Sequence, residues 1–253
     1  FRWFSRYACR YAGKHFHAVR LSKQSAEIPA EGAPLLFALN HPSWWDVITA
    51  FVLTRRWPAY QHFAPIEAAM LAKYRFFAKL GMFGIEPTSR GAAVFLRTCR
   101  AIFANSHRAL WVTVQGRFSD PRERPLELRP GVGGVASRLT SGYIIPVAVE
   151  YPFWNESKPE ILIRFGQPLS VAENPGLDTQ QWTEKLTFAL THTMDELARE
   201  ALSRDPSLFN TLINGTVGVG GVYDWWRRCM GYLRGRKTHL GHGAPEKPEV
   251  PQP

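Results

Sequence analysis

The chain has 253 residues, 45% of them hydrophobic, and its 31 basic residues outnumber its 21 acidic ones to give a formal net charge of +10. Its 16 Phe, 9 Trp and 8 Tyr can bury more apolar area than a disordered chain offers, and neither heptads nor periodic glycines indicate a coiled coil or collagen. The three cysteines are too few and too far apart for a disulfide framework or a CxxC metal site, so a reducing compartment is favoured.

The first 24 residues carry six basic residues and no acidic one. Apolar residues recur there at helical spacing, at Phe1, Phe4, Ala8 and Tyr11. Basic residues recur every four positions on another face, at Arg2, Arg6, Arg10 and Lys14. The pattern predicts an amphipathic helix within residues 1–24 that lies in a lipid interface. A terminal helix packed on the core with a solvated charged face is the alternative.

Between residues 25 and 205 short apolar runs alternate with amphipathic stretches. The runs expected as strands are 34–39, 82–86, 110–114, 143–150 and 161–165. The stretches expected as helices are 44–53, 66–80, 91–105, 132–139 and 180–203, with Ser43 as a cap for the first. This alternation predicts an α/β fold with a mostly parallel central sheet flanked by helices. No apolar run approaches the roughly 18 to 20 residues of a membrane-spanning helix.

Residues 206–237 form a second aromatic and basic segment, after which residues 238–253 are expected to be a flexible tail. Within it, residues 222–237 carry a net charge of +4, whereas residues 25–221 together carry only +1. We predict that both basic ends associate with a membrane surface that contains anionic lipids. Stacking on single-stranded nucleic acid is the alternative, but a nearly neutral core makes nucleic acid an unexpected partner.

The sequence from Asn40 to Asp46 places a histidine at the end of a predicted strand and an aspartate five positions later. The Asp46 carboxylate can fold back onto one imidazole nitrogen of His41 and leave the other nitrogen free to accept a proton from a substrate hydroxyl. A structural histidine in a strand-to-helix turn is the alternative. No GxSxG, HExxH, P-loop or GxGxxG motif occurs, and the remaining histidines lack ligand partners at metal spacing, so no metal is expected.

Four ordered blocks over residues 34–150 resemble those of the glycerophospholipid acyltransferases of the lysophosphatidic acid acyltransferase type. The first block, NHxSxxD, is matched by Asn40, His41, Ser43 and Asp46. The second is similar to residues 81–85, with Arg90 as its arginine. The third, a Glu-Gly-Thr-Arg-Ser type block, is similar to residues 114–119, which contain Gln115, Gly116 and Arg117. The fourth, a strand with a proline, is similar to residues 144–148, which contain Pro146.

The resemblance implies that residues 25–205 are an acyltransferase domain, on the cytoplasmic face of a membrane as a peripheral protein. It would move a fatty acyl group from acyl-CoA or acyl carrier protein to the hydroxyl of a lysophospholipid such as lysophosphatidic acid, with the thioester as co-substrate and no bound cofactor. His41 would be the general base and Asp46 would orient it. Arg117 and Arg90 would bind the acceptor phosphate, and Gln115, Gly116 and Pro146 would complete the substrate site.

Gln115 departs from the pattern because the third block normally carries a glutamate at this position. A neutral amide keeps the size and an acceptor oxygen but removes a charge. Two alternatives follow. Either the acceptor is a lipid other than a glycerophosphate, for example a glycosylated lipid, or the chain is a non-catalytic lipid-binding protein on the same fold. Retention of both His41 and Asp46 favours an enzyme.

Overall fold

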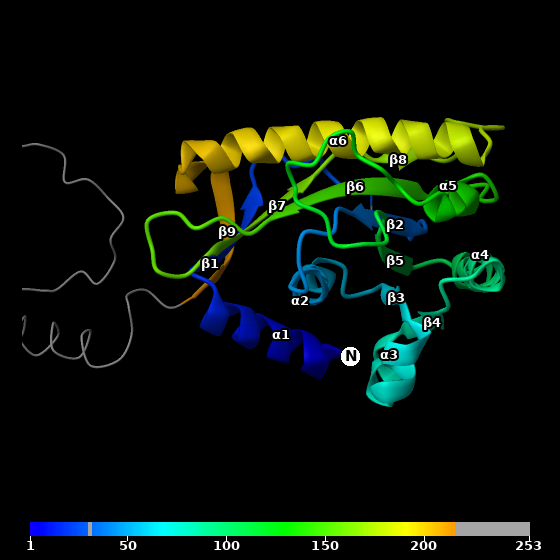
Figure 1. Ribbon diagram of the computed structural model, residues 1–253, viewed down its shortest axis with the longest axis horizontal. Helices are drawn as coiled ribbons and strands as arrows, with labels where there is room; N and C mark the ends of the chain where they lie inside the picture. The colour runs from blue at the N-terminus through cyan, green and yellow to red at the C-terminus, as the bar shows by residue number, and fades with distance from the viewer. Residues whose placement is uncertain (30–31, 216–253) are drawn as a thin grey trace, which may run out of the picture.

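The computed structural model describes residues 1–29 and 32–215, which form a central sheet with helices on both faces (Figure 1). The strands are β1 (Ala18–Ser22), β2 (Leu35–Leu39), β3 (Gln61–Glu67), β4 (Met82–Ile85), β5 (Arg108–Thr113), β6 (Tyr143–Glu150), β7 (Glu160–Phe165), β8 (Leu169–Ser170) and β9 (Phe209–Asn214). The α-helices are α1 (Arg2–His15), α2 (Asp46–Leu53), α3 (Ala68–Lys73), α4 (Ser89–Phe103), α5 (Gly131–Ala136) and α6 (Thr179–Ser203). Three short 3₁₀ helices are η1 (Thr54–Arg56), η2 (Arg75–Leu80) and η3 (Pro206–Leu208).

The sheet has the strand order β4-β3-β5-β2-β6-β7-β1-β9, with β8 beside β6. The five strands from β4 to β6 in this order run parallel, whereas β7 is antiparallel to β6 and β1 is parallel to β7. The predicted α/β class with a mostly parallel sheet is therefore confirmed. The carboxyl ends of the five parallel strands meet at one edge, which is where ligands bind in sheets of this kind.

Each face of the sheet is covered by its own set of helices. Leu36 and Ala38 of β2 point into the hydrophobic cluster that includes α4, α5 and α6. Leu35, Phe37 and Leu39 point into the cluster formed with α1 and α2. Figure 1 shows α6 along one face and α1 and α2 on the other. A central strand covered on both faces has a continuous apolar run, which explains the sequence LLFAL.

Most predicted elements form with shifts of a few residues at their ends, and the strand at Tyr143–Glu150 forms as predicted. The helix predicted over 66–80 is wrong at its start, because Ile66 and Glu67 end β3. That strand is hydrogen-bonded to β4 on one side and β5 on the other, and these pairings outweigh the helical spacing. Strands β1 and β9 were not predicted. Residues 216–253, with most of the predicted basic segment 206–237 and the tail 238–253, lie outside the described residues.

The helix α1 packs on the core, and it occupies only part of the segment 1–24, since Ala18–Ser22 forms β1. Its buried residues are Ser5, Ala8 and Ala12. The Phe4 ring meets the Phe51 ring of α2 edge-on, with centroids 4.6 Å apart. Trp3 and Tyr7 are 75% and 44% exposed. Helix α1 therefore uses part of the apolar face that was predicted to contact lipid for packing on the core. The exposed aromatic side chains of Trp3 and Tyr7 lie beside that face.

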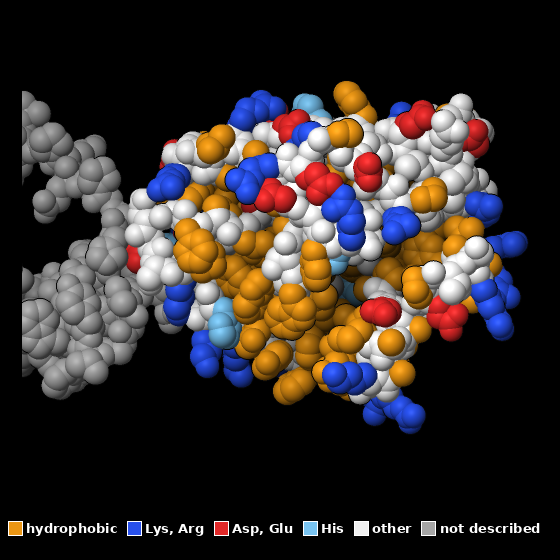
Figure 2. Space-filling model, viewed as in Figure 1, with side chains coloured by type: hydrophobic (Ala, Val, Ile, Leu, Met, Phe, Trp, Pro, Cys, Tyr) orange, Lys and Arg blue, Asp and Glu red, His pale blue; other side chains and the backbone are white. Residues whose placement is uncertain are grey.

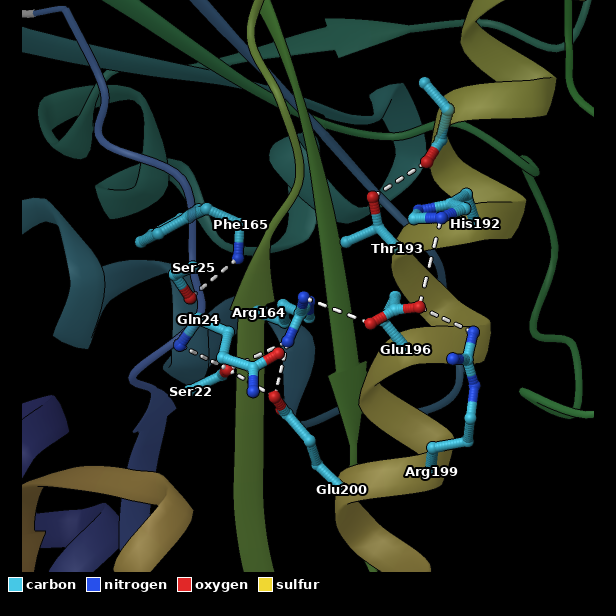
Figure 3. A network of polar contacts seen from close by, with 11 residues as sticks. Ser22, Gln24, Ser25, Arg164, Phe165, His192, Thr193, Glu196, Arg199 and Glu200 are labelled. Atoms are coloured by element: carbon cyan, nitrogen blue, oxygen red, sulfur yellow. Dashed lines mark hydrogen bonds and ion pairs between the residues drawn. The ribbon is translucent and has the colours of Figure 1, made fainter.

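A buried polar network fastens α6 to β1 and β7 (Figure 3). Arg164 of β7 donates to Ser22 of β1 at 3.1 Å, to Glu196 of α6 at 3.3 Å, and to Glu200 of α6. Ser22 in turn donates to Glu200 at 2.8 Å. Buried charges are tolerated when they are paired and hydrogen-bonded in this way, so the network fixes the position of α6 over these two strands.

Two glycines with positive φ differ in their surroundings. Gly81 follows η2 with a φ of +83°, in the left-handed region that favours glycine. A Cβ atom at this position would overlap the carbonyl oxygen of His62 in β3. Gly176 has a similar φ of +78°, but a Cβ atom there would meet nothing within 4 Å. A residue with a side chain would therefore be strained at both positions, but it would overlap another backbone atom only at position 81.

We expect Gly81→Ala to lower the free energy of unfolding by more than about 3 kcal/mol, because overlap with a backbone atom adds to left-handed strain. Gly176→Ala, the matched control, should lower it by about 1 kcal/mol through strain alone. Urea denaturation of the wild type and both variants measures the difference. Equal losses would contradict the assigned overlap.

Candidate active site

A cavity of about 590 Å³ opens at the carboxyl edge of the parallel strands. Its walls come from the ends of β2, β3 and β5, from α2, and from the residues that follow β5. Most of the lining side chains are apolar, among them Val47, Phe51, Ile66, Met70 and Trp111. His41 and Asp46 also line it, so the cavity holds the one polar pair that the sequence singled out.

His41 and Asp46 form a close hydrogen-bonded pair. His41 follows β2, Asp46 is the first residue of α2, and Nδ1 of His41 lies 2.6 Å from Oδ2 of Asp46. Since a carboxylate accepts, Nδ1 carries the proton and Nε2 is the basic nitrogen. The Asp46 side chain is 1% exposed and that of His41 is 18% exposed. In the described part of the chain, Nε2 has no hydrogen-bond partner, which leaves it free to accept a proton from a hydroxyl.

The second carboxylate oxygen of Asp46 is held by Tyr151, which the sequence analysis did not identify. The Tyr151 hydroxyl donates to Oδ1 of Asp46 at 2.6 Å and lies 3.1 Å from the hydroxyl of Thr49. Burial raises the pKa of Asp46, while the hydrogen bonds from His41 and Tyr151 oppose that rise. Burial and the Asp46 charge raise the pKa of Tyr151 well above its usual value. Tyr151 therefore stays protonated as a permanent donor.

Ser43 does not cap α2 as predicted, because the helix begins at Asp46 with Trp45 as its N-cap. The Ser43 hydroxyl accepts from the Trp45 amide at 3.3 Å, and the Asp46 carboxylate accepts from the Ser43 amide at 3.3 Å. The serine thus shapes the turn between His41 and Asp46. A short turn of this kind brings the two side chains together from only five positions apart.

Amide side chains fix the backbone around His41. Asn40 donates to the carbonyl of Val149 at 3.1 Å and accepts from its amide at 2.8 Å, which extends the pairing of β2 with β6 beyond Leu39. Gln115 is buried and its Oε1 accepts from the His41 amide at 2.8 Å. The Ser119 amide donates to the His41 carbonyl at 3.0 Å. A neutral amide is sufficient at position 115 because the bond needs only an acceptor oxygen.

The predicted binding residues fall into two groups. Gly116, with a φ of +67°, and Arg117 line the cavity beside His41. Arg90 is exposed in the first turn of α4 and does not line the cavity. Pro146 is buried within β6, where the strand changes its partner from β8 to β7, so its missing N–H breaks no ladder bond on that side. The structure therefore brings Gly116 and Arg117 to the site, and neither Arg90 nor Pro146.

Arg117 is held by a carboxylate. Its guanidinium donates twice to Glu123, with one bond of 3.1 Å and one shorter. These bonds raise the pKa of Arg117 and lower that of Glu123. In strict register with Glu-Gly-Thr-Arg-Ser, Arg117 stands at the threonine position and Phe118 at the arginine position. The Phe118 ring lies 4.4 Å from the His41 ring, so an aromatic side chain and not a cation stands beside His41 at the arginine position of the block.

A second histidine, His62, lines the cavity in a different state. Its Nδ1 accepts from Nε1 of Trp111 at 3.1 Å, and its Nε2 donates to the Trp57 carbonyl at 3.1 Å. Both nitrogens are used by the neutral tautomer, and a second proton would face the Trp111 N–H. Burial lowers the pKa of His62 to about 4. His62 is therefore part of the wall and not a second base.

A model of the family described as Acyltransferase matches residues 19–150, which is more than half of the chain. The match runs from β1 to the end of β6 and includes His41, Asp46, Gln115 and Arg117. No curated protein matches the chain. Among the described residues there is also no group of three or more His, Cys, Asp or Glu side chains suited to a metal ion.

Acidic pH should destabilise the protein through His62. The pKa of this histidine is about 4 in the folded chain against an ordinary value of 6.5, so its contribution to stability is complete above pH 6.5 and is lost as the pH falls towards 4. A pKa difference of this size corresponds to about 3 kcal/mol at most. We expect His62→Gln to flatten the dependence of the unfolding free energy on pH between 6.5 and 4.

Urea denaturation at pH 7, 5.5 and 4 measures this effect. His192→Gln is the control, because the His192 side chain is 65% exposed and its ion pair with Glu196 is long, at 3.9 Å. It should retain the wild-type pH dependence. The same slope in wild type and His62→Gln would refute the assignment.

Proposed function

This chain belongs to the acyltransferase family, and from that premise we propose that it moves a fatty acyl group from an acyl thioester to the hydroxyl of a lipid acceptor. The donor is acyl-CoA or acyl carrier protein. The observation that carries the proposal is the His41 imidazole, which is hydrogen-bonded through Nδ1 to a buried carboxylate and lines an apolar cavity.

In the proposed reaction, Nε2 of His41 takes the proton of the acceptor hydroxyl while the oxygen attacks the thioester carbonyl carbon. The new C–O bond forms, the C–S bond breaks, and the departing thiolate takes the proton from the imidazolium. Asp46 stabilises the imidazolium, and Tyr151 keeps the carboxylate oriented through its second oxygen. General-base assistance of this kind contributes on the order of 10²- to 10⁴-fold in rate.

The size and the lining of the cavity support the proposal of a lipid substrate. Its volume of about 590 Å³ is typical of ligand pockets, and its predominantly apolar lining favours a fatty acyl chain over a polar metabolite. Two exposed aromatic residues beside His41, Trp44 and Phe118, also line it. An acyl chain in the cavity and a hydroxyl at Nε2 would bring both reactants to one place.

We further propose that the protein works at a membrane surface, on the anionic cytoplasmic face. Hydrophobic side chains gather over α1, α2 and α3, with basic side chains at the border of this face (Figure 2). The exposed large ones from these elements and η2 include Trp3, Tyr7, Val47, Met70 and Phe76. Aromatic and basic residues together suit the headgroup layer. No helix of residues 1–29 and 32–215 has the length and apolarity to cross a membrane.

His41→Ala should reduce acyl transfer from oleoyl-CoA by at least about 10²-fold, because the general base is lost. Mass spectrometry of the products from a panel of lysophospholipid, monoacylglycerol and glycolipid acceptors measures the rate. His192→Ala, a change at an exposed histidine of α6, is the control and should keep the wild-type rate. Equal rates for wild type and His41→Ala would contradict the role of His41 as general base, and no product from either would support the non-catalytic lipid-binding alternative.

The double variant Trp3→Ser/Tyr7→Ser should bind anionic liposomes about tenfold more weakly than the wild type, because it removes exposed aromatic area from α1. Sedimentation with vesicles that contain phosphatidylserine measures the bound fraction. Phe188→Ser is the matched control, since Phe188 is 77% exposed on α6, which covers the other face of the sheet. A deletion of residues 1–20 would remove most of β1, so point variants test the surface more cleanly. Unchanged binding by the double variant would contradict the proposed docking face.

A further inference from the structure

The loop after β5 carries four arginines, and the first three along the chain are each paired with a carboxylate. The pairs are Arg117 with Glu123, Arg122 with Asp120, and Arg124 with Asp195. The resemblance implies that one arginine of this loop, Arg117, binds the phosphate of the acceptor. The structure instead gives the guanidinium groups of Arg117, Arg122 and Arg124 a partner from the chain itself.

Of the lysines and arginines that the structure describes, Arg117 is the one that lines the cavity. Both bonds of its guanidinium fork go to the two oxygens of Glu123, in the geometry with which arginine would hold a phosphate. Arg129 packs its stem over Gly116 but does not line the cavity. Among the described residues, the lining of the cavity therefore contains no lysine or arginine besides the paired Arg117.

The other charged residues of the lining are acidic. Glu67 ends β3 at the same edge as His41 and lines the cavity, as does Asp46. A phosphate monoester beside His41 would lose water, meet these carboxylates and compete with Glu123 for Arg117. Burying such a charge without a free partner is unfavourable.

Aromatic rings, in contrast, are exposed where the acceptor must lie. Phe118 is 60% exposed with its ring 4.4 Å from that of His41, and Trp44 is 58% exposed. Both line the cavity. Such rings offer apolar faces to the C–H surface of an uncharged polyol, whose hydroxyls remain available to the base and to water.

We infer that the acceptor is a lipid whose reacting hydroxyl belongs to an uncharged polyol headgroup, glycerol or a hexose, and not to a glycerophosphate. The inference rests on the proposed acyl transfer and names the acceptor class of the same site. It assigns Phe118 and the Arg117–Glu123 pair as the features that select against a phosphate.

A matched pair of acceptors tests this directly. 1-Oleoylglycerol and 1-oleoylglycerol 3-phosphate differ only in the phosphate, and dodecyl glucoside supplies a hexose. With oleoyl-CoA as donor and neutral detergent micelles, the wild-type full chain should show a kcat/KM for 1-oleoylglycerol at least about tenfold above that for the phosphate. Equal or higher kcat/KM for the phosphate would overturn the inference.

Glu123→Gln tests the physical cause. By releasing Arg117, this variant should shift the ratio of the two kcat/KM values towards the phosphate by about fivefold. Asp120→Asn releases Arg122, which is 86% exposed and does not line the cavity, and should leave that ratio unchanged. A Glu123→Gln ratio equal to that of the wild type would contradict the assigned role of the pair.

Failure of the acceptor class can be distinguished from failure of the proposed function. Product from the phosphate alone that is lost in His41→Ala overturns the acceptor class and supports acyl transfer. No His41-dependent product from any of the three acceptors contradicts acyl transfer, and the acceptor inference fails with it.

Discussion

The buried carboxylate of Asp46 is the group on which the arrangement of the site depends. Burial raises its pKa, so its charge persists only because donors surround it. Those donors come from two parts of the chain: the His41 ring and the Ser43 amide from the turn before α2, and the Tyr151 hydroxyl from the end of β6. Removing a donor would leave a buried charge partly unpaired, which is among the costlier defects in a protein interior.

The parallel pairing of β2 with β6 makes this arrangement possible. The register places Leu39 beside Val147, and Asn40 continues the pairing to Val149. The chain segments that follow the two strands therefore emerge at the same edge, and Tyr151 reaches a carboxylate 105 positions earlier in the sequence. On the other side of β2, β5 delivers Gln115 to the His41 backbone. The His41 ring is thus oriented by chain segments that follow strands on both sides of β2.

The protein carries a positive net charge, whereas the lining of its candidate site has no unpaired lysine or arginine among the described residues. The formal charge of +10 comes mainly from the two ends, and the exposed basic residues of α1 lie beside exposed aromatic ones. At the site, three arginines that follow β5, Arg117, Arg122 and Arg124, are paired with carboxylates. In the proposed function, the basic surface attracts the protein to an anionic membrane, whereas the residues beside His41 select the acceptor. In the proposed function docking and chemistry are separate, so a basic protein can have an acceptor pocket whose described lining contains no lysine or arginine besides the paired Arg117.

Patterns in the sequence predicted the features that depend on near neighbours: the alternation of strands and helices, and the pairing of His41 with Asp46 across five positions. They also placed Gly116 and Arg117 after a strand. The tertiary structure alone decided that Tyr151 holds Asp46, that Glu123 occupies Arg117, and that Arg90 and Pro146 lie away from the cavity. It also showed that residues 61–67 form a strand. The physical reason is that hydrogen-bond partners and strand pairing between distant segments depend on register across the sheet, which local spacing does not encode.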